Sequence, residues 1–136
     1  MRDFIAMMRE QGRVEDIERP CSAIYEAPRM ASRTDKILFF HDLDGHRAVM
    51  NLLGDRKSLA AALGVGERDL VRNLAARTYN GRVVDAGRLA GGIPADLSRL
   101  PVMKHFPGDA GRYFTAGVVF SRYGGVENAS IHRMMV

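Results

Sequence analysis

The spacing of hydrophobic residues along the chain predicts four short helices. In these stretches apolar side chains recur every three or four positions, as they do on the buried face of a helix. The predicted helices cover residues 3–11, 28–33, 55–63 and 66–76. Asp3 and Asp55 stand where N-caps belong. Gly12 and Gly64 stand where a left-handed residue ends a helix, and Pro28 suits a first helical turn.

Other stretches alternate or run continuously apolar, which predicts β-strands. These strands cover residues 14–17, 36–40, 47–53, 83–84, 114–122 and 126–136. The run KILFF at 36–40 predicts a buried strand, and the turn sequence DLDG at 42–45 separates it from its partner. Gly124 and Gly125 accept positive φ, so they predict a tight primed turn that joins the last two strands in a hairpin.

Side chains alternate between the two faces of the last predicted strand. One face would carry Asn128, Ser130, His132 and Met134, and the other Ala129, Ile131, Arg133 and Met135. A polar face on such a strand is either solvated or part of a polar site, and the pattern alone favours the solvated face.

Helices and strands alternate up to about residue 90, and strands dominate afterwards. This order predicts a small α/β domain with a β-rich end, which is an α+β chain overall. The sequence GGIP at 91–94 is the best candidate for a linker. The 136 residues are 46% hydrophobic and 26% charged, which is ordinary for one globular domain with a modest core.

The charge distribution argues against a nucleic-acid binder. The net charge is +4, but the basic residues are scattered and acidic residues lie between them. Nucleic-acid binders concentrate positive charge in a stripe with interleaved aromatic residues. The sequence shows no apolar run long enough for a membrane span, and the charged N-terminus does not resemble a signal peptide.

The cysteine and the histidines of the sequence do not by themselves predict a metal site or a catalytic site. The single cysteine, Cys21, excludes an internal disulfide and a zinc-binding cysteine cluster, and it predicts a reducing, cytoplasmic compartment. A small packed residue is its expected role, rather than a nucleophile. His41 and His46 flank an acidic turn, but without a third histidine or cysteine at ligand spacing they are expected to be exposed loop residues.

Three motifs near the C-terminus occur in a specific order. They are PGDAG at 107–111, TAG at 115–117 and NASIHR at 128–133, and NLLGDR at 51–56 and DLSRLP at 96–101 precede them. Together they resemble the UbiD family of decarboxylases, which are carboxy-lyases that use prenylated FMN. The resemblance implies an N-terminal α/β domain over residues 1–95. Residues 96–136 would then begin the split β-barrel domain that binds prenylated FMN.

The resemblance also implies roles for five residues. Arg133 matches the catalytic arginine, which also contacts the cofactor, because a guanidinium can hold a carboxylate through two parallel hydrogen bonds. Asn128 matches a ligand for Mn²⁺ or Mg²⁺ beside the flavin phosphate, with K⁺ as a further ion. Ser130, Ile131 and Thr115 match contacts to the flavin.

Each of these residues also has an ordinary explanation. Arg133 could form a surface ion pair, Asn128 could be a turn residue, and the others could simply fill strands. His105 and His132 titrate near neutral pH, but the motif assigns neither of them a role. Because Asn128 and Arg133 alternate on the strand, a site that uses both requires a local twist, a bulge or an edge-on strand.

Family enzymes are roughly three times as long as this chain. The resemblance therefore implies a fragment or a split subunit without turnover of its own. The remainder of the enzyme, or a separate C-terminal chain, would be its partner, and the complete enzyme would be a homo-oligomer supplied by a flavin prenyltransferase. The alternative is a non-catalytic accessory module.

The implied substrate is an aromatic or α,β-unsaturated acid. Three segments, EAPRM, FFHDLDGHRAVMNL and NASIHRM, resemble the sequences of archaeal family members. Some of those act on anhydromevalonate phosphate in isoprenoid synthesis. Substrates of the 4-hydroxybenzoate type, from ubiquinone synthesis, remain open beside it.

Overall fold

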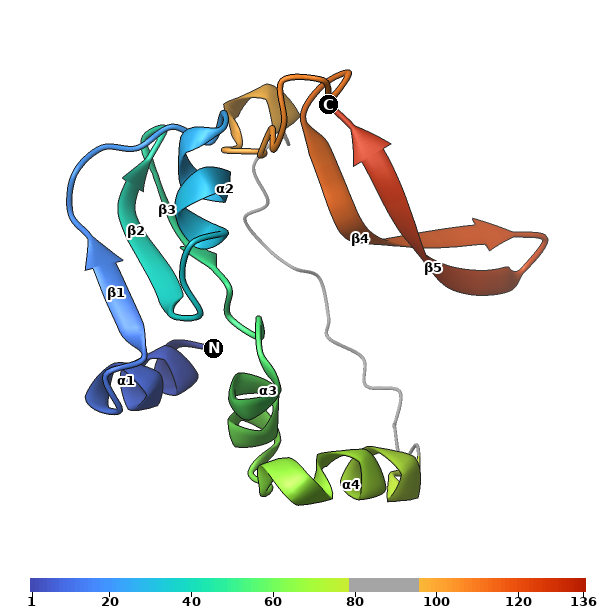
Figure 1. Cartoon of the computed structure of the whole chain (residues 1–136). Helices are drawn as coiled ribbons and strands as arrows, with labels where there is room; N and C mark the ends of the chain where they lie inside the picture. The colour runs from blue at the N-terminus through green and yellow to red at the C-terminus, as the bar shows by residue number, and fades with distance from the viewer. Residues whose placement is uncertain (79–95) are drawn as a thin grey trace.

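The computed structural model describes residues 1–78 and 96–136, and it has the expected mixture of helices and strands (Figure 1). The helices are α1 Arg2–Glu10, α2 Glu26–Ala31, α3 Arg56–Leu63 and α4 Leu70–Ala76, with 3₁₀ turns at Glu67–Asp69 and Leu97–Arg99. The strands are β1 Val14–Ile17, β2 Ile37–Leu43, β3 His46–Met50, β4 Tyr113–Tyr123 and β5 Val126–Met135. The α+β class is confirmed. The predicted strand 83–84 and linker 91–94 lie outside the described residues.

The first sheet has the strand order β1-β2-β3. β1 and β2 are parallel, with Val14 opposite Ile37, so α2 lies in the connection that crosses between them. β2 and β3 are antiparallel, and a turn at Asp44 (φ 49°) and Gly45 (φ 84°) joins them. Both turn residues have positive φ, which matches the right-handed twist of the flanking strands.

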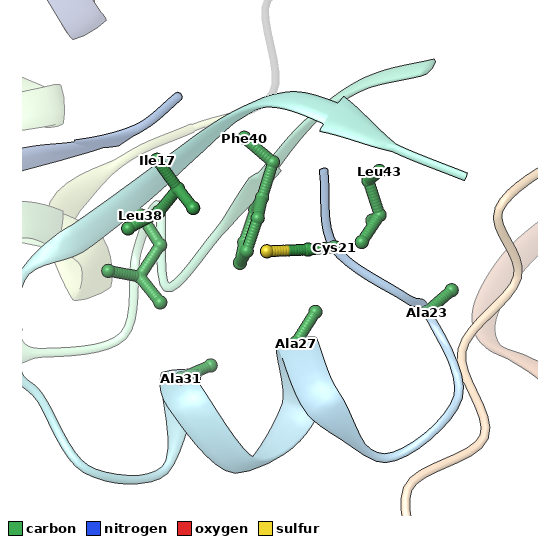
Figure 2. Close-up of a cluster of buried hydrophobic side chains, with 8 residues drawn as sticks. All are labelled: Ile17, Cys21, Ala23, Ala27, Ala31, Leu38, Phe40 and Leu43. Carbon is green, nitrogen blue, oxygen red and sulfur yellow. The ribbon is translucent and has the colours of Figure 1, made fainter. Parts of the chain in front are cut away.

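One face of this sheet packs on α2 and forms the core (Figure 2). Ala27 and Ala31 of α2 are small, so the helix can lie close to Phe40, which is fully buried. The cluster also contains Ile17, Cys21, Ala23, Leu38 and Leu43. Cys21 is therefore a packed residue, as expected, and burial raises the pKa of its thiol.

The strand KILFF is less buried at Phe39 than predicted. Ile37, Leu38 and Phe40 are buried, as predicted, whereas Phe39 is half-buried. Its ring lies on the other side of the sheet, where the Arg9 guanidinium sits 5.3 Å from the ring centroid.

Local signals predicted some helix ends and missed others. Asp55 caps α3 by accepting a 2.6 Å hydrogen bond from Ser58 N, and Gly64 ends that helix at φ 67°, so both predictions are confirmed. The prediction of Asp3 as an N-cap is wrong. Met1 stands at the N-cap and its carbonyl accepts from Ile5 N at 3.0 Å, so Asp3 lies inside the first turn. The predicted helix 66–76 is a 3₁₀ turn followed by α4.

Asn51, just after β3, links β3 to the end of α2 and to the loop before β2 through hydrogen bonds of its side chain. Its backbone is left-handed, with φ 58°, a conformation that asparagine tolerates better than most residues. Its side-chain Nδ2 donates to Ala31 O at 2.8 Å and Thr34 O at 3.1 Å, and it lies 3.4 Å from Lys36 O. One amide thus holds the end of α2 and the loop that leads into β2.

The tract before the hairpin packs on the first unit. Lys104 forms a parallel β-bridge with Ile24, with hydrogen bonds from Tyr25 N to Lys104 O at 2.9 Å and from Lys104 N to Ala23 O at 3.2 Å. Val102 beside it is buried. This tract fixes where the hairpin begins, and the domain boundary after residue 95 stays a prediction.

The second sheet is the predicted hairpin. Tyr123 pairs with Val126, and Gly124 and Gly125 between them have φ 56° and 81°. Two positive-φ residues in a two-residue loop are the type I′ turn that the sequence predicts. In the described ranges, no helix is both long and apolar enough to cross a bilayer.

We predict that Asn51→Asp destabilises the chain by about 2–3 kcal/mol, because a carboxylate cannot donate to the carbonyl oxygens that the amide now satisfies. Urea unfolding of the 136-residue chain measures the loss. Asn51→Gly is the matched variant: it accepts the left-handed backbone but lacks the amide, so it should lose less. An Asn51→Asp variant as stable as the parent would contradict this role.

Asp55 should make part of the stability depend on pH. The hydrogen bond from Ser58 N, and then Arg13, lower the pKa of its carboxyl from the ordinary 3.8. The stabilisation is therefore full above that value and is lost as the pH falls through the lower folded-state pKa.

We predict that Asp55→Asn, which can still cap α3, costs about 1 kcal/mol at neutral pH and nothing once Asp55 is protonated in the parent. Unfolding free energies measured as a function of pH test this. Asp35→Asn is the control, since Asp35 is exposed and makes no hydrogen bond or ion pair within the described residues. A cost of Asp55→Asn that does not change with pH would contradict the prediction.

Candidate functional site

The hairpin register separates the candidate residues onto two faces. Asn128 pairs with Ser121, Ser130 with Val119, and His132 with Gly117, and side chains directly opposite each other share a face. The Oγ of Ser130 lies 2.7 Å from the Nε2 of His132, which is direct contact along this polar face. We call the face of Asn128, Ser130 and His132 the polar face of the hairpin.

The opposite face carries Arg133 and a central apolar stretch, with the charged pair of Arg122 and Glu127 near the turn. Ile131 pairs with Val118 and Ala129 with Phe120 on this side. Phe120 is 81% exposed and Ile131 73% exposed. Arg133 is also exposed, and within the described residues it forms no ion pair. Arg133 thus shares a face with exposed apolar side chains, and a guanidinium in such a place can bind the carboxylate of an acid.

The ladder is irregular opposite Arg133. Phe114 pairs with Met134 and Gly117 with His132, so Thr115 and Ala116 together face Arg133. This is a β-bulge in which two residues of β4 oppose one of β5. The sequence predicted a twist, a bulge or an edge-on arrangement of the strand that carries Asn128 and Arg133. The extra residue lies on β4 instead, and β5 pairs regularly from Val126 to His132, so Asn128 and Arg133 stay on opposite faces.

Gly117 makes room within the hairpin. A Cβ added to Gly117 would lie 2.5 Å from Met134 Cε and 3.6 Å from His132 O. The glycine of the TAG motif thus leaves space that the Met134 side chain fills, directly opposite His132.

The five residues that were predicted to contact the cofactor or metal do not line one common cavity. A cavity of about 460 Å³ lies between the end of β3, the tract 101–103 and the start of β4, and Thr115 lines it. Asn128, Ser130, Ile131 and Arg133 do not line this cavity. His105, which the sequence left unassigned, does line it, and Asp109 Oδ2 accepts from its backbone N at 3.2 Å.

The polar face fits the phosphate end of a flavin and supplies little toward a metal ion. Its amide, hydroxyl and imidazole can each donate a hydrogen bond to an anion. Asn128 offers one oxygen, whereas hard divalent ions take about six ligands. In the part of the chain that the structure describes, no group of three acidic, histidine or cysteine side chains is placed to hold a metal.

A second polar cluster lies on the open face of the first sheet. His41 was expected in a loop, but β2 continues to Leu43, so His41 is a strand residue whose Nε2 lies 3.0 Å from Asp16 Oδ1. Arg9 is the main cause, before His41, of the lowered pKa of Asp16. His46 is exposed at the start of β3. The pairing of β1 with β2 brings His41 and Asp16 together, and no local signal shows this.

The contact between Ser130 and His132 could have been found from the sequence. Residues two apart on a strand share a face, and a serine hydroxyl can reach an imidazole at that spacing. The bulge, in contrast, depends on how two strands pair, and no single stretch of sequence records it.

Two family models match the chain. Residues 5–78 match the N-terminal domain of 3-octaprenyl-4-hydroxybenzoate carboxy-lyase, and residues 82–136 match its Rift-related domain. Together these matches span both the first sheet and the hairpin.

Curated relatives agree with these matches. An anhydromevalonate phosphate decarboxylase of Methanosarcina mazei is 41% identical over 143 residues, covering 99% of this chain and 33% of the relative. The protein of the same name from Aeropyrum pernix is 31% identical over 128 residues, covering 88% of this chain and 29% of the relative. The chain thus spans about a third of the length of these relatives.

A solved structure shares the fold. The UbiD-class enzyme HmfF from Pelotomaculum thermopropionicum, in complex with FMN, superposes with a TM-score of 0.79 at 29% identity. The match covers 97% of this chain and 33% of that enzyme.

Proposed function

Because the chain belongs to the UbiD family of carboxy-lyases, we propose that it is the N-terminal part or subunit of a decarboxylase that uses prenylated FMN. The observation that carries the proposal is the hairpin, which puts hydrogen-bond donors on one face and Arg133 beside apolar side chains on the other. The HmfF structures with FMN and with prenylated FMN support the choice of cofactor.

We propose trans-anhydromevalonate 5-phosphate as the substrate, in isoprenoid synthesis. The support is that the four curated relatives are all named anhydromevalonate phosphate decarboxylases. This compound is an α,β-unsaturated acid, so it belongs to the conjugated acids that the family resemblance implies.

Arg133 would hold the substrate carboxylate. A guanidinium stays charged at any working pH and offers two parallel hydrogen bonds, which fix a carboxylate in one plane before CO₂ leaves. Prenylated FMN, when bound, supplies the electron sink for this chemistry. Thr115 and Ile131 would contact the flavin from the start of β4 and from the apolar face.

The polar face would hold the phosphate end of the cofactor. Asn128 would supply one oxygen ligand to Mn²⁺ or Mg²⁺ there, with K⁺ as a further ion, and Ser130 would donate to the cofactor. The other ligands, and the carboxylates that work with Arg133, would come from outside the described residues. We therefore expect the 136-residue chain to have no turnover by itself.

The apolar face of the hairpin would be covered in the complete enzyme. Phe120 and Ile131 are highly exposed, and neighbouring exposed apolar side chains of this kind mark a surface that a partner covers. The occupant would be the remainder of the enzyme or a separate C-terminal chain. We further propose a cytoplasmic homo-oligomer that receives its cofactor from a flavin prenyltransferase. The names of the relatives favour this catalytic role over a purely accessory module.

Two substitutions in the complete enzyme, co-expressed with a flavin prenyltransferase, should separate binding from chemistry. We predict that Asn128→Ala lowers the amount of flavin and metal retained on purification. Arg133→Lys should keep the flavin and reduce turnover at least tenfold, because lysine cannot form two parallel hydrogen bonds with the substrate carboxylate. The flavin absorbance spectrum and CO₂ release measure the two effects.

Arg122→Lys is the matched control. Arg122 is an exposed arginine of the same hairpin, and its pair with Glu127, at 3.8 Å, needs no planar fork. If Arg133→Lys loses the flavin while Asn128→Ala keeps it and stays active, the two assignments are wrong.

A further inference from the structure

The contact between Ser130 and His132 is a specific feature of the polar face. The Ser130 Oγ and His132 Nε2 are 2.7 Å apart, within the range of a good hydrogen bond. Ser130 is half-buried and His132 is exposed, so the serine lies deeper in the face than the ring that contacts it. Asn128 lies two residues to the other side of Ser130 on the same strand.

The surroundings leave this pair without competing charges. Across the ladder, His132 faces Gly117 and Ser130 faces Val119. The remaining members of the face are also uncharged: Val126, Asn128 and Met134 on β5, and Phe114, Ser121 and Tyr123 on β4. Within the described residues, the imidazole is the side chain that lies within hydrogen-bond distance of the Ser130 hydroxyl.

The direction of the hydrogen bond decides what Ser130 can offer a ligand. A serine hydroxyl has one hydrogen. If His132 Nε2 accepts that hydrogen, Ser130 presents only lone pairs to its other side. If Nε2 carries its own hydrogen and donates it, the Ser130 hydrogen is released toward the open face.

The oxygens of a phosphate are acceptors, so only the second arrangement gives an attractive contact. We propose that His132 is a positioning residue, whose Nε2–H donates to Ser130 Oγ and thereby turns the Ser130 hydroxyl hydrogen toward the phosphate end of the flavin. This inference rests on the proposed function, because it assigns His132 to the same cofactor site. His132 itself need not touch the cofactor.

Four variants of the complete enzyme test the proposal with FMN as the probe. His132→Leu and Ser130→Ala should each raise the dissociation constant of FMN about five- to tenfold, the effect of one lost hydrogen bond. His132→Gln places an amide N–H where Nε2 was, so it should stay within about twofold of the parent. The double variant His132→Leu with Ser130→Ala should bind no more weakly than Ser130→Ala alone.

Quenching of flavin fluorescence gives these dissociation constants without relying on turnover. His46→Leu is the control, because His46 is an exposed histidine at the start of β3, on the other sheet. In the 136-residue chain, ¹⁵N spectra of the imidazole should show the hydrogen on Nε2, and Ser130→Ala should shift that nitrogen signal.

The outcomes distinguish this inference from the proposed function. If the parent binds FMN and His132→Leu binds it equally well, His132 does not position Ser130. The same conclusion follows if the double variant loses as much binding free energy as the two single variants together. If His132→Gln is as weak as His132→Leu, a structural role for the ring replaces the hydrogen bond. If the parent binds no FMN, the proposed function fails, and the inference fails with it.

Discussion

The register of the β4–β5 hairpin is the constraint on which the placement of every candidate site residue depends. The two-residue turn at Gly124 and Gly125 fixes which residues of β4 and β5 are opposite each other. A slip of one position would move Asn128 and Ser130 to the face that now carries Arg133. The bulge at Thr115 and Ala116 changes the pairing at Arg133, at the far end of the same ladder. The chemistry that we propose for the two faces is thus a consequence of strand pairing.

The first unit gives this hairpin a fixed base. The bridge between Ile24 and Lys104 attaches the tract before β4 to the core, and Tyr113 N donates to Met103 O at 3.3 Å where the hairpin begins. Val136 N donates to Arg112 O at 2.9 Å and joins the end of β5 to the start of β4. The hairpin is thus attached through the tract before β4, and it extends away from the first sheet with its distal part exposed (Figure 1).

The sequence predicted best what local chemistry decides. Asp55 as a cap, Gly64 as a left-handed end and the two-glycine turn each depend on a few neighbouring residues, and all three are confirmed. Phe39 is less buried than its run predicted because the two sides of the sheet are covered differently. His41 and Asp16 meet through strand pairing, which composition does not record. For the site, the motifs predicted which residues to consider, but the location of the bulge required the structure.

A crystal structure of the complete enzyme with its flavin and a substrate analogue bound would test the central claim most directly. The account predicts the flavin phosphate within hydrogen-bond distance of the face that carries Asn128 and Ser130, and the carboxylate of the analogue against Arg133. It also predicts that Thr115 and Ala116 both lie opposite Arg133. A flavin bound away from this hairpin, or a regular ladder without the extra residue on β4, would contradict it.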